Sequence, residues 1–148
     1  MPIRGSITIP GDKSISHRAL LISSLIPGKN VIKNLSTAKD VEHTLKCLNS
    51  MGINSMQDDT SLIIQGGTFR PANKPLFCGN SGTTMRLLLG LLSGLNMNAE
   101  LFGDDSLIKR PMNRIINPLR KMGANISQDN KSGSIIIKKT NELIELKH

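Results

Sequence analysis

The chain has 148 residues, of which 38% are hydrophobic and 20% charged, a balance typical of a globular domain rather than a disordered segment. The 19 Lys and Arg outnumber the 11 Asp and Glu, and the net charge of +8 favours anionic partners. With three Phe, no Trp, no Tyr and no zinc-finger spacing, the chain lacks the usual means of binding nucleic acid.

Neither a membrane span nor a secretory leader is predicted. No stretch approaches 18 uninterrupted apolar residues, and the N-terminus alternates polar and apolar residues without the apolar centre of a signal peptide. The two cysteines, Cys47 and Cys78, form no CxxC pair and no disulfide framework. We therefore expect reduced thiols in a cytoplasmic protein.

The first half of the chain predicts a leading strand, then a helix, a strand, a second helix and a hairpin. In order, their ranges are 4–10, 14–26, 30–35, 38–51, 53–57 and 61–65. Pro27 and Gly28 end the first helix, and Gly52 reads as the C-cap of the second.

The second half predicts the same series: a helix, a strand, a helix and a hairpin. These cover residues 82–95, 98–102, 110–122, 125–128 and 134–139. Pro111 fits the first turn of its helix, whereas Pro118 should bend it. Gly123 reads as another C-cap.

The two halves are also similar in sequence. LKCLNSMGINSMQD (45–58) lies over INPLRKMGANISQD (116–129), and GDKSISHRALL (11–21) lies over GNSGTTMRLLL (79–89). Two matches in the same order indicate a repeated β-α-β-α-β-β unit, with a small loop insertion between them. The predicted fold class is therefore two-layer α/β, with helices on one face of mixed sheets. We expect the leading strand in 1–12, the first unit in 13–74 and the second in 75–148.

Three polar segments precede predicted helices and carry candidate binding residues. In GDKSISHR, the hydroxyls of Ser14 and Ser16 and the cations Lys13 and Arg18 stand at a helix start, where free N–H groups and the helix dipole favour anions. A capped helix with solvated cations is the simpler interpretation of this segment alone. The phosphate-loop pattern G-x-x-x-x-G-K-[ST] is not satisfied.

The other two segments resemble the first in placement. CGNSGTTMR combines Gly79 and Gly82, which let a ligand approach the backbone, with Arg86. GDDSLIKRPMNR places Lys109 and Arg110 before a predicted helix, and Arg114 reads as a surface cation. Three cationic helix starts in a repeated unit suggest convergence on one small polyanion.

Together, GDKSISHRALLISSL, CGNSGTTMRLL and GDDSLIKRPMNRIINPLRKMGA strongly resemble the 3-phosphoshikimate 1-carboxyvinyltransferase (EPSP synthase) family. The resemblance covers essentially the whole chain. It implies transfer of the carboxyvinyl group of phosphoenolpyruvate to the 5-hydroxyl of 3-phosphoshikimate, with release of phosphate. It also implies no metal, no organic cofactor and a monomeric full-length enzyme in the shikimate pathway of aromatic amino-acid biosynthesis.

The resemblance also assigns roles to residues. It implies that Lys13 contacts both substrates, and that Ser14 and Arg18 bind 3-phosphoshikimate. Gly82, through its backbone, and Arg110 would bind phosphoenolpyruvate. The supporting residues would be Asn80, which steadies the loop or touches substrate, and Arg86, which we interpret as structural. His17 matches the motif but receives no proton-transfer role.

The sequence departs from the family in length. The family is roughly three times longer, and its acid–base residues lie downstream, so we expect no catalytic residue within this chain. We interpret the chain as the N-terminal portion of such an enzyme, inactive alone, whose leading strand would pair with the other domain. The alternatives are a non-catalytic small-anion-binding module and, less favoured, a basic nucleic-acid-binding domain.

Overall fold

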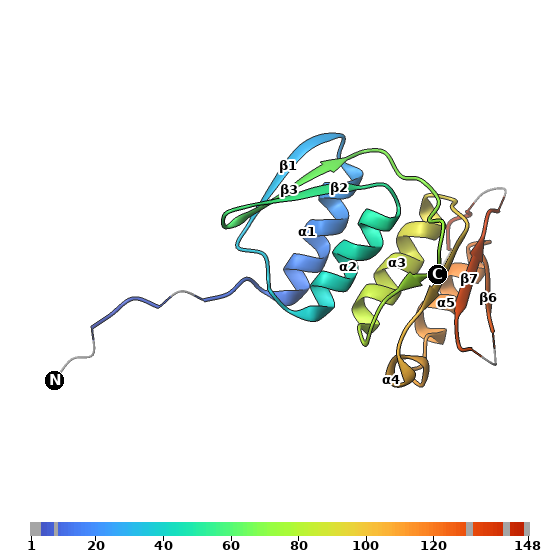
Figure 1. Cartoon of the computed structure of the whole chain (residues 1–148). Helices are drawn as coiled ribbons and strands as arrows, with labels where there is room; N and C mark the ends of the chain where they lie inside the picture. Colours follow the sequence, from blue (N-terminus) through green and yellow to red (C-terminus); the bar gives the residue numbers. More distant parts are fainter. Residues whose placement is uncertain (1–3, 8, 130–131, 141–142, 147–148) are drawn as a thin grey trace.

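Two small sheets, each covered on one face by its own helices, make up the fold (Figure 1). The computed structural model describes residues 4–7, 9–129, 132–140 and 143–146. The first unit contains α1 (Lys13–Leu25), β1 (Gly28–Lys33), α2 (Lys39–Ser50), β2 (Asn54–Asp58) and β3 (Ser61–Gly66). The second contains β4 (Leu76–Phe77), α3 (Gly82–Gly94), β5 (Ala99–Phe102), α4 (Asp105–Ile108), α5 (Asn113–Lys121), β6 (Asn125–Gln128) and β7 (Ile135–Lys138).

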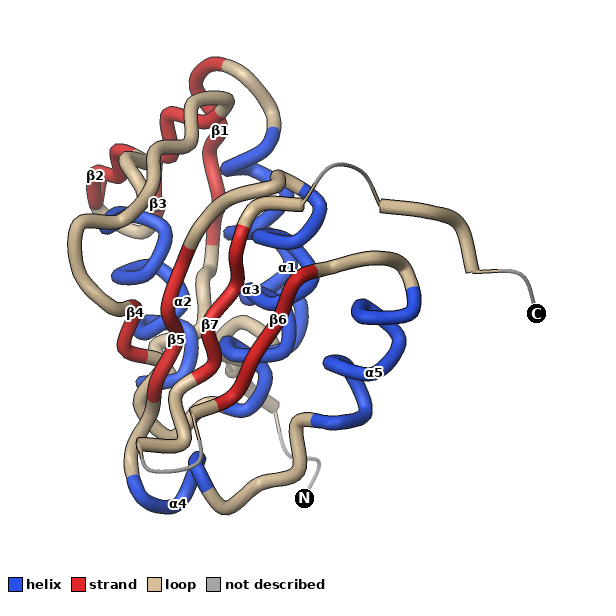
Figure 2. Tube along the Cα trace, turned by 90° about the vertical axis from the view of Figure 1, so that its right-hand side faces the viewer, coloured by secondary structure: helices blue, strands red, loops and turns tan. Residues whose placement is uncertain are grey.

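Strand pairing confirms the repeated unit. The first sheet has the order β1-β3-β2 and is antiparallel throughout. The second has the order β4-β5-β7-β6, seen face-on in Figure 2, in which β4 runs parallel to β5 and the other pairs are antiparallel. The order β1-β3-β2 thus matches β5-β7-β6, and only the second sheet is mixed. Among the described residues, the first sheet has no counterpart of β4.

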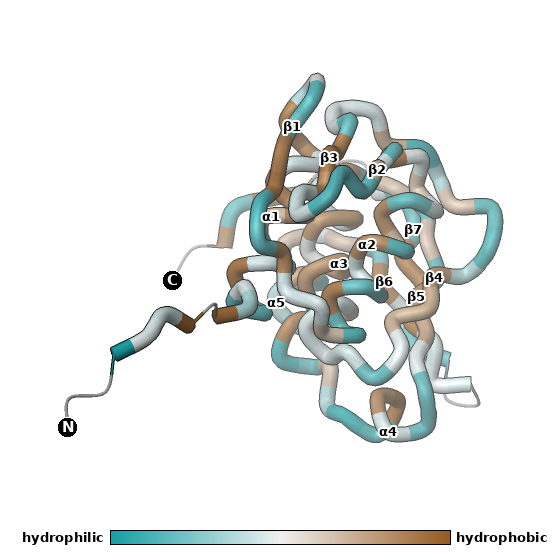
Figure 3. The backbone as a smooth tube through the Cα atoms, turned by 60° about the vertical axis from the view of Figure 1, so that its left-hand side comes forward, coloured by the Kyte–Doolittle hydropathy of each residue, from teal (hydrophilic) through white to brown (hydrophobic). Residues whose placement is uncertain are grey.

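The leading strand predicted over residues 4–10 does not form in this chain. Its described residues have no strand partner, and the side chains of Ile7 and Ile9 are 87% and 68% exposed. Figure 3 shows this segment running away from the body of the molecule. A strand needs a paired edge, and the hydrogen bond found between the described residues of this segment and the rest of the chain runs from Asn34 Nδ2 to the carbonyl oxygen of Ile9 at 3.4 Å. Its pairing with another part of a longer protein stays a prediction.

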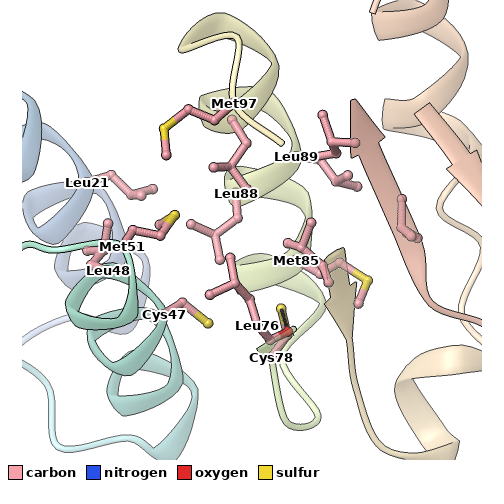
Figure 4. Packing of buried hydrophobic residues seen from close by; sticks show 14 of the residues in the cluster. Leu21, Cys47, Leu48, Met51, Leu76, Cys78, Met85, Leu88, Leu89 and Met97 are labelled. Carbon is pink, nitrogen blue, oxygen red and sulfur yellow. Dashed lines mark hydrogen bonds between the residues drawn. The ribbon is translucent and has the colours of Figure 1, made fainter. Parts of the chain in front are cut away.

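The core continues from one unit into the other through α2 and α3. Figure 4 shows Leu88 of α3 facing Leu48 of α2 and Met51 at its C-cap, while Leu89 and Met85 lie on the side of the second sheet. These five side chains are at most 2% exposed. Burying a side chain of this size stabilises a fold by about 1.5–3 kcal/mol, so this seam fixes the two units relative to each other.

Two cysteines lie at the same seam. Cys47 of α2 and Cys78, which follows β4, are free thiols with 2% and 0% exposure. Hydrogen bonding with Cys47 and burial both raise the pKa of Cys78 far above that of an ordinary thiol. Cys78 therefore lacks the thiolate character of a reactive cysteine, and Cys47 is shielded by its burial.

The glycines predicted to end two helices lie at the observed ends of α2 and α5. Gly52 and Gly123 adopt φ values of +88° and +94° directly after the C-caps of α2 and α5, which confirms both as helix terminators.

No helix in the described part of the chain is long and apolar enough to cross a bilayer.

The helix predicted over 110–122 is wrong at its start, because α5 begins only at Asn113. A short helix that the sequence did not suggest, α4, precedes it; the carboxylate of Asp104 caps α4 by accepting hydrogen bonds from the amides of Ser106 and Leu107. Pro118 lies inside α5, which continues beyond it to Lys121. Arg110 therefore lies in the loop between the two helices.

Candidate functional site

Four helices present their N-termini at one end of the molecule. They pack in the order α1, α2, α3 and α5, and α4 lies at the same end (Figure 1). Contacts between first turns tie the ends together: Lys13 Nζ lies 3.1 Å from Asp40 Oδ2, and Thr84 Oγ1 lies 3.1 Å from the Asp40 carbonyl oxygen. Each helix N-terminus carries about half a positive charge, so this edge attracts anions.

The first group of predicted residues lies on α1. Lys13, Ser14 and Arg18, hereafter the α1 half-site, are all exposed, and Arg18 Nη1 donates to the Ser14 carbonyl oxygen at 3.0 Å. The helix is capped not by serine but by Asp12, whose carboxylate accepts a 2.7 Å hydrogen bond from the amide of Ile15. This carboxylate therefore occupies one of the free backbone donors at the start of α1.

The second group gathers at the start of α3. Asn80, Gly82, Arg86 and Arg110, hereafter the α3 half-site, come from the β4–α3 loop, α3 and the α4–α5 loop. The Nη2 atom of Arg110 donates a hydrogen bond to Oδ1 of Asn80. A methyl group added at Gly82 would lie 2.8 Å from Nη1 of Arg86 and 3.5 Å from Nη1 of Arg110. Two guanidinium groups thus converge over a residue that has no side chain.

Arg86 and Asn80 both position their neighbours. Arg86 Nη2 donates to the carbonyl oxygen of Pro111 at 3.4 Å and so joins α3 to the loop that carries Arg110. Asn80 holds the Arg110 guanidinium from the other side. The supporting roles of both residues in substrate binding stay a prediction. Lys109 is the C-cap of α4, and Arg114 lies in α5. The cations predicted at one helix start therefore lie partly in the loop before α5 and partly in α5 itself.

The two half-sites are joined by residues to which sequence reasoning gave no role. Asp40 of α2 pairs with Lys13 through its carboxylate and accepts from Thr84 through its carbonyl oxygen. Thr44, also on α2, lies 2.8 Å from both His17 Nδ1 and Thr84 Oγ1. The sequence signal that could have identified them is a histidine and two threonines on helix faces that are otherwise apolar. Within the described residues, no group of three His, Cys, Asp or Glu side chains could hold a metal ion.

His17 is a neutral base in this environment. It has no exposed surface, and burial is the main effect that lowers its pKa. Asp40 acts in the opposite direction, and the cations Lys13 and Arg18 add smaller lowering effects.

Stability is therefore expected to fall in mildly acidic solution. Since the pKa of His17 is lower in the folded state, the unfolded chain takes up the proton first, and stability present above about pH 6.5 is lost as the pH falls through the folded pKa. Urea unfolding followed by circular dichroism at about pH 8 and about pH 5.5 measures this loss. His17→Gln should make the loss smaller; an unchanged pH dependence in that variant would exclude His17 as its source.

Structural comparison defines the class of protein. An EPSP synthase from Acinetobacter baumannii superposes with a TM-score of 0.89 and 34% sequence identity, over 97% of this chain and 34% of that chain. A second structure of an EPSP synthase from the same organism gives a TM-score of 0.85 over 93% of this chain. The repeated β-α-β-α-β-β units are those of the enolpyruvyl transferase fold.

Sequence comparison gives the family. The family of EPSP synthase (3-phosphoshikimate 1-carboxyvinyltransferase) matches residues 1–147, so the chain belongs to it. The 3-phosphoshikimate 1-carboxyvinyltransferase of Streptococcus uberis is 49% identical over 128 residues, and that of Geobacillus kaustophilus is 46% identical over 127 residues. These matches cover 84% of this chain and 30% of each relative, so the chain spans about a third of the length of the relatives it matches.

Proposed function

We propose that this chain supplies part of the substrate site of an enolpyruvyl transferase. The complete enzyme would move the carboxyvinyl group of phosphoenolpyruvate to the 5-hydroxyl of 3-phosphoshikimate and release phosphate. The observation that carries the proposal is the convergence of two cationic half-sites at one edge of parallel helix N-termini. Both proposed substrates are polyanions, which such an edge attracts.

The half-sites divide the two substrates between them. Ser14 and Arg18 bind 3-phosphoshikimate, whose carboxylate suits the planar fork of an arginine. Gly82 and Arg110 bind phosphoenolpyruvate, with Asn80 and Arg86 holding the arginine and its loop in place. Lys13, the first residue of α1, serves both substrates.

The chemistry itself is assigned to the rest of the longer protein. No residue of this chain is proposed as the acid or base, and the proposal involves no metal or organic cofactor. We place the enzyme in the cytoplasm, as a monomer in aromatic amino-acid biosynthesis, without nucleic acid or membrane partners.

Calorimetric titration of the complete protein with each substrate tests the function directly. Binding of 3-phosphoshikimate, followed by phosphate release when phosphoenolpyruvate is added, is the expected result. Binding of both substrates without phosphate release would favour a non-catalytic anion-binding module. Tight binding of a short RNA that weakens steeply with salt, without binding of 3-phosphoshikimate, would favour a nucleic-acid-binding domain instead.

Gly82→Ala is expected to weaken phosphoenolpyruvate binding selectively. The new methyl group would displace the Arg86 guanidinium, 2.8 Å away, and come into van der Waals contact with that of Arg110. Stability should change little, because alanine is favourable in a helix and the displaced groups are ends of flexible side chains. Separate titrations should show a loss of phosphoenolpyruvate affinity with 3-phosphoshikimate affinity retained. Unchanged affinity for phosphoenolpyruvate would remove Gly82 from the site.

A further inference from the structure

Four buried polar side chains connect the two half-sites, and none of them belongs to the proposed binding residues. His17 on α1, Thr44 on α2, Ser81 at the N-cap of α3 and Thr84 in its first turn all have 0% exposure. The successive contacts, His17 Nδ1 to Thr44 Oγ1, Thr44 Oγ1 to Thr84 Oγ1, and Thr84 Oγ1 to Ser81 Oγ, each measure 2.8 Å. We refer to these four residues as the buried chain.

The hydrogens of the buried chain can be assigned from its acceptors. The hydroxyl of Thr84 is within donating distance of two acceptors, the Asp40 carbonyl oxygen at 3.1 Å and Ser81 Oγ at 2.8 Å, which share its single hydrogen. The hydroxyl of Thr44 then donates to Thr84 Oγ1. Thr44 in turn accepts from His17, which fixes the imidazole in the tautomer with hydrogen on Nδ1.

In this arrangement Thr84 Oγ1 both donates its hydrogen and accepts from Thr44. Ser81 Oγ also accepts from the amide of Thr84 at 3.1 Å, which closes the cap of α3. The remaining atom is His17 Nε2, which is buried and has no partner in the described structure. An unprotonated acceptor is the less costly state for such an atom, which agrees with the neutral imidazole inferred above.

The buried chain also lies where it can set geometry. Thr84 is two residues from Gly82, and Ser81 is adjacent to it, so their hydrogen bonds hold the first turn of α3 against α2. His17 lies one turn of helix after Lys13 and Ser14 and holds α1 against the same helix. A fully satisfied buried polar network rigidifies its surroundings, whereas a broken one leaves buried groups unpaired.

We propose that His17, Thr44, Ser81 and Thr84 are positioning residues that fix the α3 half-site relative to the α1 half-site. They touch neither substrate. Their loss moves the first turn of α3, and hence Gly82 and its arginines, away from a ligand already bound on α1. This inference rests on the proposed function, because it assigns the two half-sites to two different substrates.

The test compares Thr84→Val with Thr84→Ser in the complete protein. Valine keeps the shape of threonine but cannot donate to the Asp40 carbonyl, whereas serine keeps the hydroxyl. Thr84→Val should lower phosphoenolpyruvate affinity, measured by titration in the presence of saturating 3-phosphoshikimate, at least tenfold. Affinity for 3-phosphoshikimate alone should stay within twofold of the original protein, and Thr84→Ser should restore both values to within twofold.

One control separates positioning from a general loss of stability. Leu92→Val removes a buried methylene from α3 far from its N-terminus and should lower the unfolding temperature without changing either affinity. The inference fails if both variants, Leu92→Val and Thr84→Val, lose phosphoenolpyruvate affinity in the same proportion to their loss of stability. The role of Thr84 would then be only structural. The inference also fails if folded Thr84→Val keeps its phosphoenolpyruvate affinity.

A milder pair of variants covers the case in which Thr84→Val does not fold. Ser81→Ala removes a hydroxyl of the buried chain, whereas Ser93→Ala removes a buried hydroxyl at the other end of the same helix. Ser81→Ala alone should weaken phosphoenolpyruvate binding; equal behaviour of the two variants overturns the inference. If the original protein binds neither substrate, the proposed function fails instead, so the two failures are distinguishable.

Discussion

Replacing Arg110 with alanine is expected to weaken phosphoenolpyruvate binding by roughly 2–5 kcal/mol while leaving 3-phosphoshikimate binding nearly unchanged. The Arg110 guanidinium is held by Asn80 and lies beside Gly82, so its removal takes a charge from one half-site only. Arg18→Ala should have the opposite selectivity, because Arg18 lies on α1 and contacts that helix. Calorimetric titration of each variant with each substrate measures both losses.

Arg114→Ala is the matched control for these two variants. Arg114 is an exposed cation in the first turn of α5, at the same end of the molecule but in neither half-site. Its removal should leave both affinities within a fewfold of the original, which shows that net charge alone does not explain the losses. If Arg110→Ala and Arg18→Ala each weaken both substrates equally, the division of the site between the two helices is wrong.

The second large effect concerns the 148-residue chain expressed by itself, which is expected to release no phosphate from phosphoenolpyruvate. Its proposed binding residues are present, but proton transfer and closure around both substrates are assigned to the longer protein. Weak binding of 3-phosphoshikimate is the most that should remain, since Lys13, Ser14 and Arg18 form only one wall of a site.

A phosphate-release assay with both substrates, run beside calorimetry with 3-phosphoshikimate alone, checks this expectation. The complete protein at the same concentration is the positive control, and mass spectrometry of the short chain excludes contamination by the longer one. Phosphate release at an enzyme-like rate would show that the short chain carries the chemistry.

Much of the fold could be predicted because the two halves of the chain independently predict the same series of helices and strands. Local sequence signals predicted the two glycines that end helices, Gly52 and Gly123, and the hairpins that follow them. Tertiary structure did not alter these features. The leading strand stays a prediction, because strand pairing is not a local property: an alternating sequence needs a paired edge, and the described residues of this segment have no strand partner within the chain.

The start of α5 shows the limit of matching one unit onto the other. The loop before α2 has five residues (34–38), whereas the loop before α5 has ten (103–112) and folds α4 within it. Leu107 of α4 is fully buried, and Ile108 lies so close to Gly133 that a side chain there would collide with it. This tertiary contact favours the formation of α4 over an earlier start of α5. The local sequence gives no signal for such a contact.

The candidate site was predictable in its charges but not in its connections. Helix starts rich in Lys, Arg and Gly identify the residues of the two half-sites. Thr44 and Thr84 are 40 positions apart, on helices of different units, and nothing in their local sequence indicates that their hydroxyls meet. Such contacts arise only from the packing of α2 against α3.

The buried thiols make this part of the protein convenient for site-directed labelling. Maleimides react with exposed thiolates, and neither Cys47 nor Cys78 offers one, because both are buried and the pKa of Cys78 is raised. A single cysteine introduced at an exposed position, such as Thr37→Cys before α2, would therefore carry the fluorophore without removal of either native cysteine in this segment. A change in the fluorescence of that dye on substrate binding would then report a change in its surroundings at the edge with the half-sites.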